Sequence, residues 1–70
     1  MNHYTVVSNK DITSWHVKIE DVAPLETYDK KDKAIEAGER LAKQNRPSTL
    51  SILDDENHDL EEKRTYEKDD

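Results

Sequence analysis

Three histidines and one acidic run are the side chains of this chain whose types suit metal chemistry. A zinc site needs three or four convergent ligands at a recognisable spacing, and His3, His16 and His58 show no such spacing. The run from Asp54 to Asp59 is similar to a calcium loop. It lacks the Gly at the sixth position and the Glu at the twelfth that an EF-hand requires. We therefore expect no metal ion and no cofactor, exposed histidines, and a polar turn at the acidic run.

Catalytic signatures are also missing from the sequence. The serines do not lie in the context of a nucleophile elbow, and Gly38 is the sole glycine, so no Gly-rich phosphate loop can form. Acidic side chains number 17, so pairs of carboxylates arise by coincidence. We predict that the chain is not an enzyme and binds no small-molecule substrate.

A change of hydrophobic period shows which elements position these side chains. Residues 14–20 alternate between apolar and polar, which predicts a strand with Trp15, Val17 and Ile19 on one face. Residues 29–45 carry apolar side chains at helical spacing, which predicts an amphipathic helix. Asp29 is the expected N-cap of this helix, and Asn45, followed by Pro47, is the expected C-cap in a left-handed conformation.

Three further segments have the composition of strands: residues 3–7, 48–53 and 60–66. Pro24 marks residues 21–28 as a connection. The predicted fold class is α+β, in the order strand, strand, helix, strand, strand. A four-stranded, mainly antiparallel sheet has one helix packed on one face. Residues 1–66 form a single domain, and residues 67–70 are an acidic flexible tail.

The core of so short a chain must be thin. It has 70 residues, of which 31% are hydrophobic, and small domains bury a smaller fraction of their surface than large ones. Gly38 in mid-helix costs up to about 1 kcal/mol relative to Ala, which indicates close contact between helix and sheet. Dimerisation is one way to supplement such a core. The predicted core residues are Val6, Trp15, Val17, Ile19, Ile35, Gly38, Leu41, Ala42, Leu50 and Ile52.

Charge is distributed unevenly along the chain. The net charge is −6, yet residues 30–46 hold six basic and three acidic side chains. An acidic chain is a poor general binder of nucleic acid, because phosphate contacts dominate such affinity. The chain has no Cys, no apolar run of about 18 residues and no signal-peptide region after Met1. We expect a cytoplasmic protein that does not bind membranes.

The candidate interaction surface is the sheet face that the single helix leaves uncovered. We assign Tyr4, His16, Lys18 and Tyr66 to it. If Tyr4 and Tyr66 share that face they form an aromatic patch, which is typical of interfaces; the alternative is cross-strand pairing within the sheet. The basic helix face is either solvated, with Glu36–Arg40 and Glu39–Lys43 pairs, or a docking site for an acidic partner.

Five short stretches resemble one family when taken in order. They are residues 15–18 (Trp-His-Val-Lys), residues 33–37, residues 41–45, residues 50–54 and residues 64–66 (Arg-Thr-Tyr). Together they resemble the small bacterial and phage proteins of domain-of-unknown-function family 2188. The resemblance covers roughly residues 3–66, implies a compact domain and supplies no catalytic residues.

These observations favour a small non-enzymatic interaction module that binds a protein partner or forms a homodimer. The alternative is a nucleic-acid-related binding module, or an acidic mimic of nucleic acid that occupies a basic protein. A basic helix on a sheet favours the first version of this alternative, and the net charge of −6 favours the second.

Overall fold

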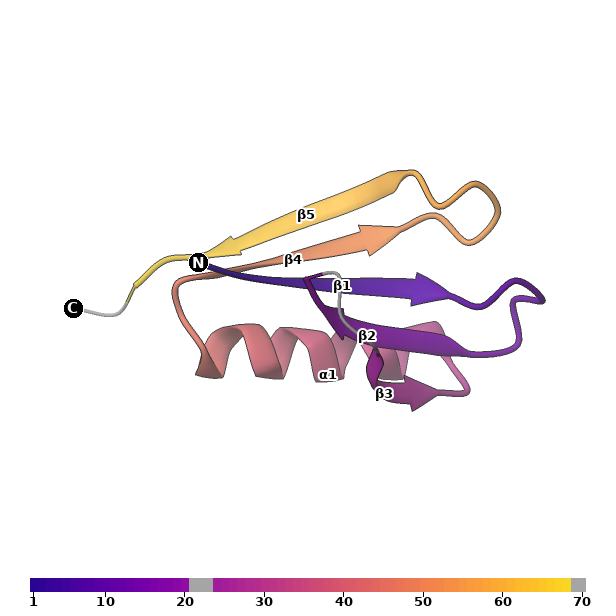
Figure 1. The fold of residues 1–70 in the computed structure, drawn as a ribbon, viewed down its shortest axis with the longest axis horizontal. Helices are drawn as coiled ribbons and strands as arrows, with labels where there is room; N and C mark the ends of the chain where they lie inside the picture. Colours follow the sequence, from indigo (N-terminus) through magenta and orange to yellow (C-terminus); the bar gives the residue numbers. More distant parts are fainter. Residues whose placement is uncertain (21–23, 69–70) are drawn as a thin grey trace.

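A computed structural model describes residues 1–20 and 24–68 of the chain. One α-helix lies against one face of a five-stranded sheet (Figure 1). The elements are β1 (Asn2–Ser8), β2 (Trp15–Ile19), β3 (Pro24–Tyr28), α1 (Lys31–Gln44), β4 (Ser48–Leu53) and β5 (Leu60–Tyr66). Residues 69 and 70 of the expected tail lie outside the described residues, as do residues 21–23 of the expected connection.

The sheet is mixed, in the order β3-β2-β1-β4-β5. β1 and β4 are parallel, and the other three strand pairs are antiparallel. The predicted α+β class and the helix on one face are confirmed. The predicted count of four strands is wrong, because the segment with Pro24 forms the edge strand β3. Proline cannot donate a hydrogen bond to a neighbouring strand, and it is tolerated at the first residue of an edge strand.

The helix ends where the sequence predicts, but it begins later. Lys30, not Asp29, is the N-cap, and it makes no side-chain capping bond. Asn45 is the C-cap: its backbone N–H bonds to the Leu41 and Ala42 carbonyls, and its side-chain amide donates to the Leu41 carbonyl at 2.8 Å. Its φ of −123° lies outside the left-handed region, so the expected left-handed cap is wrong.

Small residues form the centre of the helix–sheet contact. Ala34, Ala37, Gly38 and Ala42 are the buried residues of α1. A Cβ on Gly38 would lie 2.9 Å from Cδ1 of Leu50, so glycine sets the distance between helix and sheet. The larger helix side chains flank this stripe and are therefore only partly buried.

The predicted core is confirmed in its centre and corrected at its margin. Val6, Val17, Ala42, Leu50 and Ile52 are buried hydrophobic residues, and Gly38 is buried too. The correction concerns four predicted core residues that are only partly buried: Trp15, Ile19, Ile35 and Leu41. Three residues missing from the prediction are buried in their place, namely Tyr4, Ala34 and Ala37.

Candidate interaction surface on the open sheet face

The sheet face opposite α1, which we call the open face, is set by strand register. On β1 the side chains of Tyr4, Val6 and Ser8 are buried toward the helix. The alternate residues therefore lie on the open face, because successive side chains of a strand point to opposite faces. Directly paired residues share a face, which places the following residues there: His3, Thr5, Val7, His16, Lys18, Thr27, Thr49, Ser51, Leu53, Lys63 and Thr65.

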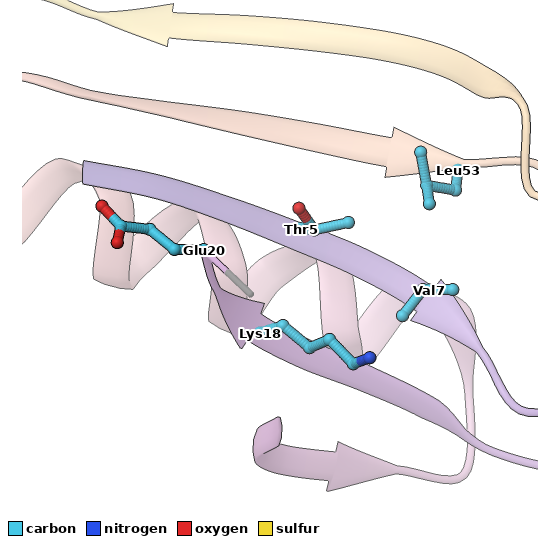
Figure 2. Close-up of a pocket in the computed structure, with 5 residues that line it drawn as sticks. All are labelled: Thr5, Val7, Lys18, Glu20 and Leu53. Atoms are coloured by element: carbon cyan, nitrogen blue, oxygen red, sulfur yellow. The ribbon is translucent and has the colours of Figure 1, made fainter. Parts of the chain in front are cut away.

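A hollow of about 340 Å³ lies in the middle of the open face. Figure 2 shows the five residues that line it: Thr5, Val7, Lys18, Glu20 and Leu53. Val7 and Leu53 lie near one end, and Glu20 lies at the other (Figure 2). The hollow thus offers apolar contact, a hydroxyl and two charges of opposite sign, which suits a mixed protein surface.

The polar groups of the open face are partly tied to one another. His3 Nδ1 lies 2.8 Å from the Thr49 hydroxyl, and His16 Nδ1 lies 3.0 Å from the Thr27 hydroxyl. Within the described part of the chain, Lys18 makes no ion pair, although its side chain extends along one side of the hollow toward Val7 (Figure 2). Its ammonium group is therefore available to an acceptor on a partner.

The structure brings together two of the four side chains predicted for this surface. His16 and Lys18 lie on the open face as expected. Tyr4 does not, because it is in register with Val6 and is buried in the core, with 3% exposure. Tyr66 lies opposite the buried Ser48, on the helix-facing side, where it packs against the core. The expected aromatic patch is therefore wrong, and Thr5 takes the position considered for Tyr4.

The acidic run after β4 folds back onto the molecule. Asp55 accepts a hydrogen bond from the Trp15 indole at 3.0 Å and lies 3.5 Å from the Lys31 ammonium. Burial alone would lower the pKa of Lys31, but its hydrogen bond to Glu61 and the charges of Asp55 and Glu61 raise it overall. The sequence did not lead us to predict the hydrogen bond between Trp15 and Asp55. The available signal was the need of a half-buried Trp for a hydrogen-bond acceptor.

Ser8 and His58 form the nearest approach to a catalytic pair. The Ser8 hydroxyl lies 3.4 Å from Nε2 of His58, and it donates to the Asp55 backbone carbonyl at 3.2 Å. Ser8 is 3% exposed, so a substrate cannot reach its oxygen. Among the described residues, no three or more of His, Cys, Asp and Glu gather where they could hold a metal ion.

The outer side of α1 carries paired charges. Glu39 bonds to Lys43 at 2.9 Å, which confirms one predicted pair, and it also accepts from Arg64 of β5 at 3.1 Å. Lys33 lies 3.6 Å from Asp29. A second hollow, of about 290 Å³, lies among the charged side chains along this side of the helix.

The comparison with known proteins places this geometry in a family. Residues 4–66 match the profile of domain-of-unknown-function family 2188, described as an uncharacterized protein conserved in bacteria. The chain belongs to this family. The "Uncharacterized protein YycD" of Bacillus subtilis (strain 168) is 43% identical over 51 residues, which are 73% of this chain and 77% of the relative. No solved structure matches the chain.

The resemblance inferred from the five sequence stretches is thus confirmed. It identifies a small α+β protein of a bacterial family, and neither description assigns an activity. In the described part of the chain, no helix has the length and apolar character needed to cross a membrane.

Proposed function

We propose that this chain is a non-enzymatic interaction module that binds a protein partner through its open face. The observation that supports the proposal is the hollow lined by Thr5, Val7, Lys18, Glu20 and Leu53 on the sheet face opposite α1. Apolar contacts at one end of the hollow, together with a hydroxyl and two charges, suit the mixed composition of transient protein interfaces. We assign the interaction to the cytoplasm, because the chain has no Cys and oxidising compartments favour disulfides.

The open face is a better docking surface than the outer side of α1. Charges on the helix are exposed and already paired, as in Glu39–Lys43 and Lys33–Asp29. Exchanging one exposed ion pair for another gives little net free energy. Lys18 is half-buried against the sheet, so a partner's carboxylate would meet an ammonium group that is partly shielded from water.

An enzymatic role has less support. Small-molecule sites bury most of their ligand in a concave pocket, whereas this hollow lies on the exposed face of a sheet. The Ser8 hydroxyl is buried and bonded to a backbone carbonyl.

Nucleic acid is the alternative partner. Lys18, Lys63 and two histidines on the open face would favour it. Single-stranded nucleic acid is held by stacking on aromatic side chains. The described residues of the open face include no Tyr, Trp or Phe, because Tyr4 and Tyr66 lie on the other side. The net charge of −6 further disfavours phosphate binding, so a protein partner is favoured.

The test is quantitative affinity capture from the native cell with two double variants, one on each surface. Lys18→Glu with His16→Ala changes the open face, and Lys33→Glu with Arg40→Glu changes the outer side of α1. We expect the first variant to lose a partner that the wild type retains, and the second to keep it, while both melt near the wild-type temperature. Loss of the partner only in the helix variant would contradict the proposal, and capture abolished by nuclease would favour nucleic acid.

A further inference from the structure

The two edges of the sheet are unequal. Within the described residues, β3 and β5 each have one side without a strand partner. β3 has five residues, begins with Pro24 and shifts register against β2. β5 has seven residues and pairs regularly with β4 from Glu62 to Tyr66. Unpaired edges are templates for another strand, and Pro, shortness and bulges blunt them. β5 is therefore the edge better able to accept one.

Space for an added strand exists beside β5. The helix packs against β1, β2, β3 and β4. β5 is the outermost strand beyond β4 in Figure 1, and it contacts the helix through the Arg64–Glu39 and Lys31–Glu61 ion pairs. A strand that extended the sheet past β5 would not displace α1.

The charges on β5 alternate in sign, so β5 is complementary to a second copy of itself that runs in the opposite direction. Glu62 and Arg64 are opposite the buried Ile52 and Leu50, so both lie on the helix-facing side. Lys63, between them, is opposite Ser51 on the open face. In an antiparallel pair, directly opposite residues share a face and opposite charges there are favourable.

We propose that a second copy of this chain pairs antiparallel with β5, in a register centred on Lys63. A two-fold axis perpendicular to the sheet then puts Glu62 of each copy opposite Arg64 of the other. Because Glu62 and Arg64 already pair within each chain, the two copies join these pairs into one network of four alternating charges. A register centred on Glu62 also gives two opposite-charge pairs, Glu61 with Lys63, but Glu61 lies at the register shift of β5. A register centred on Arg64 gives no opposite-charge pair and places Arg64 against its own copy. The product is a continuous sheet with both helices on one side.

The same charges limit what else can pair with this edge. A strand without a matching acid–base pattern would leave Glu62 or Arg64 opposite a like or neutral side chain, which is how charged edges prevent random association. Lys63 opposite its own copy is unfavourable, and the register shift at Leu53–Leu60 shortens the regular ladder. A contact this small is expected to be weak and concentration-dependent.

This inference does not depend on the partner proposed for the open face, because it uses the backbone edge of β5. Sedimentation equilibrium of the full chain, from micromolar to millimolar concentration, measures the association. Because each single charge reversal creates two like-charge pairs, we expect Glu62→Arg or Arg64→Glu to weaken association about tenfold or more. Lys18→Glu with His16→Ala should leave it unchanged, which separates the two proposals.

Complementation distinguishes a lost contact from a damaged fold. An equimolar mixture of the Glu62→Arg and Arg64→Glu chains restores both opposite-charge pairs across the interface. We expect this mixture, and the double variant Glu62→Arg with Arg64→Glu, to recover dimerisation close to wild-type level.

Disulfide trapping tests the register, since the chain has no native Cys. Two Lys63→Cys chains would meet within the Cα separation of about 4.4–6.8 Å that a disulfide needs. Thr65→Cys, on the same face, is the control, because its two copies would lie four residues out of register, about 13 Å apart. We expect fast cross-linking of the first chain only. A wild type that stays monomeric to millimolar concentration, equal cross-linking of both, or a mixture that fails to associate overturns the proposal.

Discussion

The covered and open faces of this sheet carry different side chains on the same strands. On β4, Ser48, Leu50 and Ile52 are buried under the helix. On the other face Thr49 is buried as well, but Ser51 and Leu53 are only partly buried. On the covered side the sheet contributes large side chains and the helix contributes Ala and Gly. A chain with 31% hydrophobic residues thus fills one thin core and leaves the second face mostly polar, with Val7 and Leu53 as its apolar residues in the hollow.

The difference shows how little apolar material such a fold needs. Close approach at Gly38 lets Leu50 and Val6 contact the helix backbone region directly. The open face satisfies its polar groups across strands, as His3 does with Thr49 and His16 with Thr27. Stability and binding are therefore expected to depend on different residues.

The largest expected effect compares neighbours on β4. Leu50 is 0% exposed, so Leu50→Ala should lower the free energy of unfolding by about 2–5 kcal/mol, the range for a buried Leu. Ser51→Ala, one residue along and on the open face, should change it by no more than about 0.5 kcal/mol. Urea unfolding followed by far-UV circular dichroism measures both. Equal losses of unfolding free energy in the two variants would contradict the expected difference between the covered and open faces.

The sequence predicted the strand residues of this core better than its helix residues. Alternation in β2 and the run in β4 identified Val17, Leu50 and Ile52 correctly, because a period of two assigns a face unambiguously. On the helix, the predicted core residues Ile35 and Leu41 are only partly buried, and Ala34 and Ala37, which the prediction left out, are buried. A helix drawn close to a sheet instead buries its smallest side chains, and that closeness is a tertiary property.

The next prediction concerns the close packing of α1 on the sheet at Gly38. Gly38→Ala would gain helix propensity, but its Cβ would lie 2.9 Å from Leu50 Cδ1 and 3.3 Å from Val6 Cγ2. Overpacking typically costs about 1–3 kcal/mol, so we expect a net loss of stability. Thermal and urea unfolding of Gly38→Ala measure it.

Leu50→Val provides the matched background, because it shortens the side chain that the new methyl would meet. We expect Gly38→Ala to cost less in that background than in the wild type, as residues in contact are non-additive. An equal cost in both backgrounds would show that the Gly38–Leu50 contact does not limit packing.

A smaller effect is expected at Asp55, in the acidic turn after β4, which accepts a hydrogen bond from Trp15. Asp55→Ala leaves the Trp15 indole without its acceptor, which should cost about 1–2 kcal/mol. Asp55→Asn keeps an acceptor oxygen and should cost less. Chemical unfolding monitored by Trp15 fluorescence measures both variants, and Glu56→Ala, in the same turn and exposed, is the control. Equal losses in Asp55→Asn and Asp55→Ala would mean that charge, and not the indole bond, matters.

Site prediction was limited by strand phase and by long-range contacts. The sequence assigned His16 and Lys18 to the open face because β2 alternates cleanly. β1 reads His-Tyr-Thr-Val-Val, where apolar character is nearly continuous from Tyr4 to Val7, so its phase was ambiguous. The hollow joins residues of three strands and could not be inferred before the parallel pairing of β1 with β4 was known.

The smallest expected effect is a pH dependence confined to the covered side. Hydrogen bonding to Arg64 lowers the pKa of Glu62, and bonding to Lys43, with the charge of Arg64, lowers that of Glu39. A lowered pKa in the folded state stabilises the fold above the ordinary glutamate value of 4.5, and this contribution is lost as the pH falls through the lowered value.

Arg64→Gln should therefore lower the melting temperature at neutral pH, and its difference from the wild type should shrink below about pH 4.5. The effect is expected to be small because both carboxylates are solvent-exposed or nearly so. Lys63→Gln is the matched control: it removes the same charge one residue away, on the open face, where Lys63 makes no ion pair with the described residues. Melting curves across this pH range should show no such convergence for it. Convergence in both variants would mean that the pH dependence reports net charge and not the Arg64 contacts.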